Sequence, residues 1–416
     1  MSQQAHSQDS GPAVMPNDAA RGRPRAASPP FLLLVALTSA SPFALNAMTP
    51  ALPRMADALA VPFAVIQLVL TVALLAFGLA QLVAGPLSDR FGRRSLVIAG
   101  LTVFAGGSLV SALSTSATVL IIGRALQAGG GATAFVLTRT IVYDTHERDA
   151  ATAKISYMVM AMILAPLVGT LAGGYLVDYA GWRSIFWLIA AFGTALALLA
   201  SIKLAETNAY LGTPRTLGRI LLEARELLTL PEFWGYSGAA AFASGMFFAF
   251  LGVAPFIFEK IMGEPPSSFV NYFVLMSAGY MAGNFLSARL AARLGPVRMI
   301  GLGSVLAGIG IVLFWLMSGI NQPIALFLPM MFVTCSNGLV LPSATVGAMA
   351  LRPTLSGTAS GVGGMLQMIV AALTTTVIGA FLSTTSLPML TALTVCWLAS
   401  ILCLLLVARR ARLDAA

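Results

Sequence analysis

The sequence predicts an all-α membrane protein with twelve transmembrane helices in two six-helix halves. Apolar residues make up 58% of the 416 residues and charged residues only 9%, whereas a soluble domain carries roughly 25% charged residues. The mean hydropathy is +0.88. The length leaves room for about twelve helices of the ~20 residues that cross a bilayer, and one long polar stretch divides the apolar runs into two groups of six.

Each predicted span is an apolar run bounded by charge, proline or glycine. In chain order the runs cover residues 31–51, 63–83, 96–113, 119–142, 156–177, 185–204, 233–257, 269–288, 297–317, 324–348, 357–382 and 387–407. Segments with few large apolar side chains cannot form a core and are expected to be disordered or at the surface. The predicted organisation is a disordered cytoplasmic tail at 1–30, an N-terminal half at 31–204, a cytoplasmic linker at 205–231 with a surface helix at 217–228, a C-terminal half at 232–408 and a cytoplasmic tail at 409–416.

Lysine and arginine side chains lie mostly on one side of these spans. Twenty fall on the side of the tail and the linker, three (Arg54, Arg183 and Lys260) fall on the other side, and Arg124 lies inside a span. Because cytoplasmic loops carry the excess of Lys and Arg, we expect both termini in the cytoplasm. The net charge of +9 therefore reflects membrane orientation, since no basic run is interleaved with the aromatic residues that would suggest a nucleic-acid site.

The densest cluster of charge between two apolar runs follows the second run. A charge within hydrocarbon costs a few kcal/mol, so this segment is expected to be a tight loop at the cytoplasmic face. Its defining residues are Gly85, Asp89, Arg90, Gly92, Arg93 and Arg94. Their spacing, G-x-x-x-D-R-x-G-R-R, resembles the loop signature between the second and third helices of the major facilitator superfamily.

Further stretches carry the same resemblance. The fourth span contains Arg124 and Gln127 in a pattern similar to R-x-x-Q-G, residues 178–186 read D-x-x-x-W-R-x-I-F, and residues 357–360 read G-T-A-S. A motif of the fifth span resembles the antiporter pattern G-P-x-x-G-G and consists of Pro166, Gly169, Gly173 and Gly174. Together these stretches are similar to the Bcr/CflA branch, the bicyclomycin-resistance and chloramphenicol-efflux type of drug:proton antiporter.

The resemblance implies that the charged loop is a conformational latch. Asp89 would be held by the N–H end of the eleventh span in the outward-facing state, and Asp144, at the end of the fourth span, would be a second acid for Arg93 or Arg94. The alternative is a plain positive loop with solvated charges that meets only the topology rule.

Arg124 lies inside an otherwise apolar span and has no acidic residue within a helical turn. An intramembrane charge must face protein or water and often marks a functional site. The functional hypothesis is a fixed positive charge beside the transport path, with Gln127 on the same helix face. The alternative is a structural arginine that bonds Asn46 and carbonyl groups of the first span.

Two positions depart from the branch. Asn46 stands where the branch usually carries Asp, and Thr170 stands where the motif of the fifth span has proline. No Asp or Glu lies at mid-membrane in the predicted spans. A proton gradient as the energy source, with no cofactor, therefore rests on the resemblance alone.

The resemblance to the major facilitator superfamily implies that spans 1, 4, 7 and 10 line a substrate cavity. Together with span 11, they give as predicted cavity residues Asn46, Met48, Met246, Phe247, Phe250, Asn337, Met365 and Gln367. Met and Phe side chains can repack around different shapes, which suits loosely specified amphipathic drugs. Such side chains are equally common in the core of any helix bundle, and the glycines of the fifth span are expected to serve close helix packing.

Other functional classes lack their signatures. The sequence has no G-x-x-x-x-G-K-[ST] loop for an ATP-driven pump, and its two histidines, His6 and His146, lie outside the spans and are unsuited to an intramembrane metal. Cys335, Cys396 and Cys403 all lie within spans, so no disulfide is expected.

We therefore expect no enzyme but a monomeric, secondary active multidrug efflux transporter of the bacterial cytoplasmic (inner) membrane. Its partners would be the lipid bilayer and a small amphipathic substrate, exported by alternating access in exchange for protons. The alternative is a transporter of the same fold that imports or exports a small metabolite. Because Arg124 is a positive charge inside a span, an anionic metabolite is a candidate substrate of this alternative.

Overall fold

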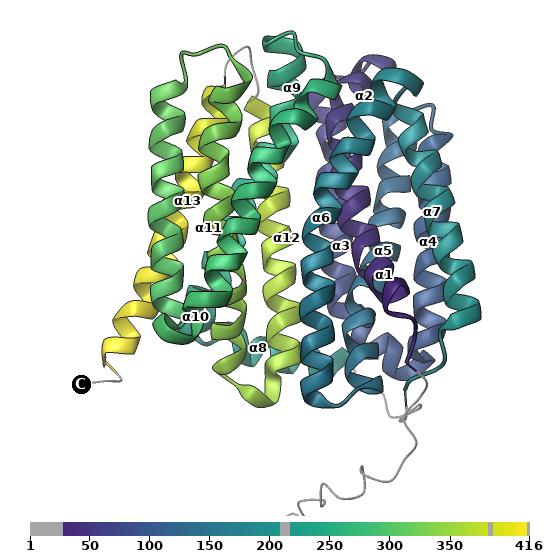
Figure 1. The fold of residues 1–416 in the computed structure, drawn as a ribbon, viewed down its shortest axis with the longest axis vertical. Coiled ribbons are helices and arrows are strands. Elements are labelled where there is room, and N and C mark those ends of the chain that lie inside the picture. Colours follow the sequence, from purple (N-terminus) through teal and green to yellow (C-terminus); the bar gives the residue numbers. More distant parts are fainter. Residues whose placement is uncertain (1–27, 209–216, 382–385, 414–416) are drawn as a thin grey trace, which may run out of the picture.

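The computed structural model describes residues 28–208, 217–381 and 386–413. Within these ranges the chain is helical, without a strand, and its long helices run side by side in two halves (Figure 1). The N-terminal half consists of α1 (Phe31–Ala47), a short 3₁₀ turn (Thr49–Ala51), α2 (Leu52–Ala58), α3 (Phe63–Phe91), α4 (Arg93–Ala112), α5 (Ala117–Thr145), α6 (Arg148–Ala180) and α7 (Trp182–Lys203). The linker forms α8 (Leu217–Leu228), and the C-terminal half consists of α9 (Pro231–Phe256), a π-helical turn (Ile257–Ile261), α10 (Pro266–Met317), α11 (Pro323–Ala350), a 3₁₀ turn (Pro353–Leu355), α12 (Ser356–Phe381) and α13 (Leu387–Leu413).

Eleven helices in the described ranges are long and apolar enough to cross a membrane. One of them, α10, has 52 residues and would extend about 78 Å at 1.5 Å per residue, more than twice the ~30 Å of a hydrocarbon core. It changes direction at Gly295, whose φ of 74° favours glycine, followed by Pro296. Because α10 supplies both the eighth and the ninth predicted span, the prediction of twelve spans is confirmed.

The charged motif at residues 85–94 is not the tight loop that we expected. Helix α3 continues through Phe91 and α4 begins at Arg93, so that Gly92 alone separates the two helices. A helix satisfies its own backbone hydrogen bonds and need not end where it leaves the hydrocarbon. The prediction of a loop across this segment is therefore wrong, although its charges still lie at the end of the bundle.

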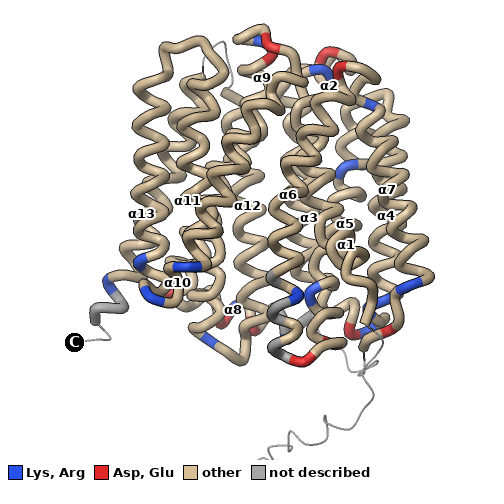
Figure 2. The backbone as a smooth tube through the Cα atoms, in the orientation of Figure 1, with Lys and Arg blue, Asp and Glu red and all other residues tan. Residues whose placement is uncertain are grey.

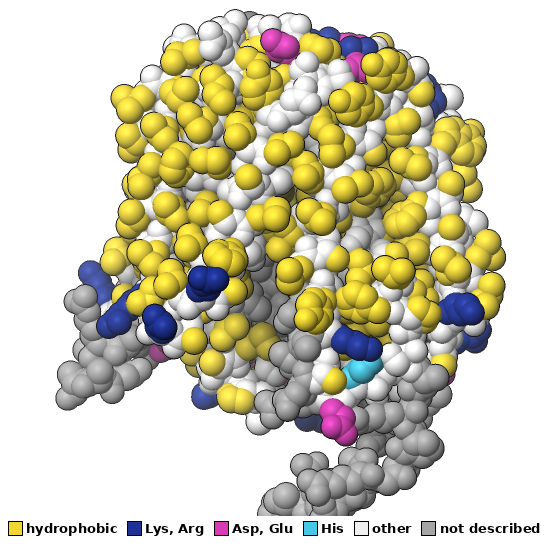
Figure 3. All heavy atoms as spheres, viewed as in Figure 1, with side chains coloured by type: hydrophobic (Ala, Val, Ile, Leu, Met, Phe, Trp, Pro, Cys, Tyr) yellow, Lys and Arg dark blue, Asp and Glu magenta, His cyan; other side chains and the backbone are white. Residues whose placement is uncertain are grey.

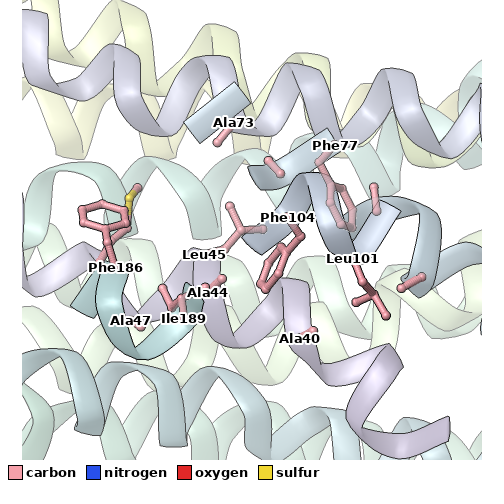
Figure 4. Close-up of a cluster of buried hydrophobic side chains, with 14 of the residues drawn as sticks. Ala40, Ala44, Leu45, Ala47, Ala73, Phe77, Leu101, Phe104, Phe186 and Ile189 are labelled. Atoms are coloured by element: carbon pink, nitrogen blue, oxygen red, sulfur yellow. The ribbon is translucent and has the colours of Figure 1, made fainter. Parts of the chain in front are cut away.

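Each half has its own apolar core, and the halves meet where α3 packs against α12 and α6 against α10. In the N-terminal half, the ring of Phe104 fits against Gly131 and Gly193, beside side chains of α1 (Figure 4). Apolar side chains also cover the flank of the bundle seen in Figure 3. Such a surface suits contact with lipid chains.

Charged residues gather at the two ends of the bundle (Figure 2). One end carries Arg90, Arg93 and Arg94 together with α8, the start of α1 and the end of α13 (Figure 1). We call it the basic end. The other, called the opposite end, carries α2 and the π-helical turn after α9.

Candidate transport site

A cavity of about 270 Å³ lies between the two halves, near the middle of the long helices. Four helices of each half contribute to its wall: α1, α3, α5 and α6, and α9, α10, α11 and α12. Its lining residues are Pro42, Leu45, Asn46, Phe77, Phe135, Met162, Ile163, Pro166, Ser244, Phe247, Phe248, Phe273, Met276, Ser277, Tyr280, Thr334, Asn337, Leu341, Gln367 and Met368. Because none of these is Asp, Glu, Lys, Arg or His, the wall formed by the described residues carries no formal charge.

Half of the eight predicted cavity residues line this space: Asn46, Phe247, Asn337 and Gln367. Met48, Met246 and Phe250 are fully buried in the apolar cores of the two halves instead. Met365 packs beside Gly78 of α3. A helix turns by about 100° per residue, so these four residues lie on the expected helices but face away from the cavity.

The sequence interpretation of the cavity wall missed the contributions of α3, α6 and α10. From α10 come Phe273, Met276, Ser277 and Tyr280, whose i, i+3, i+4, i+7 spacing places them on one helix face. This stripe of polar and apolar side chains at helical spacing was the signal that could have identified them.

Two carboxamides of the cavity wall hold buried oxygen atoms without a partner in the described part of the chain. Asn46 Nδ2 donates to the carbonyl of Pro42 at 2.9 Å, while its Oδ1 has no partner. Asn337 Oδ1 is likewise buried and unpaired. By contrast, Gln367 Oε1 accepts the hydroxyl of Ser244 at 3.1 Å. An unsatisfied buried polar atom costs roughly 1–3 kcal/mol, so the two asparagines favour a ligand that can donate hydrogen bonds.

Arg124 lies inside the N-terminal half rather than on the cavity wall. Its side chain is 1% exposed, and its Nη1 donates to Gln127, which donates in turn to Ser108 of α4 at 2.6 Å. Nε and Nη2 have no hydrogen-bond partner among the described residues, and the ring of Phe186 lies 6.0 Å away. The alternative bond from Arg124 to Asn46 is absent from the described structure: Asn46 Oδ1, the atom that could accept it, has no partner, and Asn46 Nδ2 donates to Pro42.

The glycines of the span 5 motif lie where helices approach closely. A Cβ on Gly169 would lie 2.5 Å from the carbonyl oxygen of Phe43, and a Cβ on Gly173 would overlap the carbonyl of Ala47, both in α1. A Cβ on Gly174 would lie 2.9 Å from the carbonyl oxygen of Pro266 in α10. Gly174 therefore lies at the contact between the two halves, whereas Pro166 lines the cavity.

At the basic end, Arg93 joins the two predicted acids. Its Nη1 lies 2.6 Å from Asp89 Oδ1, and its Nε lies 3.3 Å from Asp144 Oδ2. Arg94 donates to the carbonyl of Ser201 at 2.7 Å, and Arg90 stacks on the neighbouring ring of Phe91. All these contacts remain within the N-terminal half.

Glu206, just after α7, is a partner that the sequence interpretation missed. Its carboxylate accepts backbone N–H groups of Arg93 at 2.8 Å and Arg94 at 3.1 Å, the first residues of α4. It also accepts the N–H groups of Thr207 and Asn208, at 3.0 and 2.9 Å. A carboxylate at a helix N-terminus pairs with unsatisfied donors and with the positive end of the helix dipole.

We expect Gly92→Ala to destabilise the protein by at least ~1–3 kcal/mol, because φ is 90° and a Cβ would lie 2.4 Å from Glu206 Oε2. The matched control is Gly85→Ala, since a Cβ at Gly85 meets no atom within 4 Å. Thermal unfolding of the purified variants measures the difference. Equal melting temperatures for the two variants would show that Gly92 and Glu206 do not hold this turn.

Two ion pairs join the halves at the opposite end. Arg54 Nε of α2 lies 2.5 Å from Glu259 Oε1, and Lys260 Nζ lies 2.6 Å from Asp57 Oδ2. Within the described ranges, every ion pair between the N-terminal and C-terminal halves lies at this end.

Asp178, at the end of α6, makes a further contact between the halves. Its Oδ2 accepts the N–H of Ser267 in the first turn of α10 at 2.9 Å, and its Oδ1 lies 3.6 Å from Arg54 Nη2. Nearer the middle, Gln67 Nε2 donates to the carbonyl of Gly252 at 3.0 Å. Polar contacts thus close the opposite end above the cavity.

The basic end has a second cavity, of about 350 Å³, between α3, α5 and α12. Asp89, Arg93 and Arg139 line it together with Thr358 at the start of α12. The hydroxyl of Thr358 donates to the carboxylate of Glu223 in α8 at 2.6 Å. Asp89 therefore faces the same space as the start of α12 but bonds Arg93. The halves are in polar contact at one end and separated by a cavity at the other.

The sequence profile of the Major Facilitator Superfamily matches residues 34–375. The chain belongs to this superfamily. It is therefore a multi-pass membrane transporter rather than an enzyme. Solved structures support the fold: the peptide transporter POT in complex with sulfate has a TM-score of 0.72 at 15% identity, covering 91% of this chain and 94% of that chain. A bacterial homolog of the human lysosomal transporter Spinster, in its inward-facing and unoccupied conformation, has a TM-score of 0.68 at 16% identity, covering 92% and 96%.

Curated relatives within the Major Facilitator Superfamily carry names from drug resistance. The chain is 27% identical to the bicyclomycin resistance protein homolog of Haemophilus influenzae, over 89% of this chain and 94% of that protein. It is 28% identical to multidrug resistance protein D of Escherichia coli, over 82% and 85%. It is 29% identical to a chloramphenicol resistance protein of Pseudomonas aeruginosa, over 81% and 80%. The resemblance to the bicyclomycin-resistance and chloramphenicol-efflux branch is thereby confirmed.

Proposed function

We propose that this protein is a secondary active multidrug efflux transporter that exports small amphipathic molecules across the bacterial inner membrane in exchange for protons. The observation that carries the proposal is an uncharged, mostly apolar central cavity between two halves whose ion pairs, among the described residues, lie at one end only. The names of the curated relatives support drugs as the substrates. We propose that a single chain suffices, because the cavity is formed within one chain.

Alternating access follows from the two ends. The basic end is the cytoplasmic end by the positive-inside rule, so the described conformation is the one in which substrate reaches the cavity from the cytoplasm. Export then requires the Arg54–Glu259 and Lys260–Asp57 pairs to separate. At the same time the cavity at the basic end closes, and Asp89 moves to the N-terminus of α12, where the helix dipole favours a carboxylate.

Proton coupling uses groups outside the cavity, since the described wall has no acidic side chain. We propose Asp89 and Asp144 at the basic end as the exchanging carboxylates, with the buried charge of Arg124 influencing proton traffic in the N-terminal half. Transport of an anionic metabolite has less support, because no cationic side chain lines the cavity among the described residues.

The test is transport by everted membrane vesicles. An imposed pH gradient, acid inside, is expected to drive uptake of chloramphenicol into vesicles that contain the protein, at several times the rate of vesicles without it. Collapse of the gradient with a protonophore should abolish the difference. Uptake that survives the protonophore would exclude proton exchange, and a lack of uptake across a panel of uncharged and cationic drugs would exclude drug efflux.

A further inference from the structure

The two walls of the central cavity differ in polarity. The N-terminal half contributes one polar side chain, Asn46, and otherwise apolar groups such as Leu45, Met162 and the paired rings of Phe77 and Phe135, whose centroids lie 5.4 Å apart. The C-terminal half contributes the other polar side chains of the described wall: Ser244, Ser277, Tyr280, Thr334, Asn337 and Gln367.

Part of this polar wall is left for a ligand. The hydroxyl of Thr334 donates a hydrogen bond to the carbonyl of Met276, at 2.8 Å. In the described part of the chain, Ser277 Oγ and Gln367 Nε2 have no protein partner, and Asn337 Oδ1 is buried without one. These atoms include both donors and acceptors, so they match hydroxyl and amide groups rather than an ion.

The absence of formal charge from the wall also restricts the ligand. A permanent cation that enters the cavity loses its water and meets no carboxylate on the described wall, which disfavours its binding. The volume of about 270 Å³ lies just below the usual range of ligand pockets, roughly 300–1,000 Å³. A compact, uncharged molecule therefore fits both the charge and the size of the site.

We propose that the cavity selects compact, uncharged amphipathic molecules and binds them in one orientation, with the hydrogen-bonding groups on α10, α11 and α12 and the apolar face on α3, α5 and α6. This inference rests on the proposed export of amphipathic drugs and names their charge class and their orientation. Asn337, Ser277 and Gln367 recognise the polar side of the ligand. Phe77 and Phe135 pack against its apolar side.

Equilibrium binding to the purified protein tests the orientation. The probes are chloramphenicol, which carries hydroxyl and amide groups at one end of an aromatic ring, and its analogue with both hydroxyl groups replaced by hydrogen. The wild type should bind chloramphenicol about tenfold more tightly than the analogue. Asn337→Leu and the milder Ser277→Ala should reduce that ratio, whereas Phe77→Leu should weaken both ligands and keep the ratio, as a double-mutant cycle requires.

The charge class is tested with an analogue of chloramphenicol that carries a trimethylammonium group in place of the nitro group, a permanent cation of similar size. The wild type should bind it at least tenfold more weakly than chloramphenicol, and Asn46→Asp should strengthen its binding by placing a carboxylate on the wall. If the wild type binds the cation as tightly as chloramphenicol, the charge class is wrong. If Phe77→Leu alone removes the preference for chloramphenicol over its analogue without hydroxyl groups, the orientation is wrong. Because binding needs no gradient, a protein that shows this pattern without vesicle transport would refute drug export but not the inference.

Discussion

Replacing Arg124 with methionine is expected to abolish drug efflux and yet raise the thermal stability of the purified protein. The guanidinium is 1% exposed, has no carboxylate within ion-pair distance in the described structure and leaves two nitrogen atoms unpaired. A buried charge without a partner destabilises a fold, and replacement of buried ionic groups by apolar residues of similar volume stabilises proteins by about 1–4 kcal/mol. We therefore expect Arg124 to serve transport rather than the stability of the fold.

The companion variants separate charge from geometry. Arg124→Ala should abolish coupled efflux, whereas Arg124→Lys should retain part of it if the charge matters more than the planar guanidinium. Vesicle uptake and melting temperature are measured on each variant at matched membrane levels. If Arg124→Lys and Arg124→Ala are equally inactive and Arg124→Met melts at a lower temperature than the wild type, Arg124 has a structural role. Its bond to Gln127, which in turn bonds Ser108, would then hold α5 against α4.

The fold could be predicted from the sequence because the bilayer imposes a length and an apolar composition on every span. The break at Gly295, for example, lies between the apolar runs of the eighth and ninth spans. The composition therefore separates these two spans, although α10 is continuous on both sides of Gly295. The segment before Gly92 could not be predicted in the same way. Hydropathy locates the membrane boundary, but the backbone hydrogen bonds of α3 continue past that boundary to Phe91.

The sequence allowed us to predict most of the helices that line the candidate site, but not which face of each helix lines it. Phe247 lines the cavity and its neighbour Met246 is buried in the core, and one residue of error rotates a prediction by about 100°. Contacts between segments far apart in the sequence were harder to predict. Arg54 and Glu259 are 205 residues apart, and nothing in their local sequence fixes how the two halves meet.

Asp89→Asn is expected to reduce efflux about two- to thirtyfold at wild-type membrane levels, and to trap the protein with its basic end open. In the described conformation the Asp89 carboxylate bonds Arg93 at 2.6 Å and faces the cavity beside the start of α12. Closure of that cavity would bring the carboxylate to a helix N-terminus, a contact worth about 0.3–1 kcal/mol at a surface and up to ~2 kcal/mol when partly buried. Asparagine lacks the charge, so the closed state loses this stabilisation.

The matched control is Asp57→Asn combined with Glu259→Gln, which removes both ion pairs at the opposite end. Ion pairs near a protein surface contribute about 0.2–1 kcal/mol each, so removing two of them should shift the population about two- to thirtyfold towards the state closed at the basic end. Spin labels at Tyr143 and Ala350, at the basic ends of α5 and α11, report the separation of the halves once Cys335, Cys396 and Cys403 are replaced. The Asp89 variant should lengthen that distance on average and the double variant should shorten it. Shifts in the same direction would mean that the two ends do not compete, and the alternating-access roles assigned to these residues would then fail.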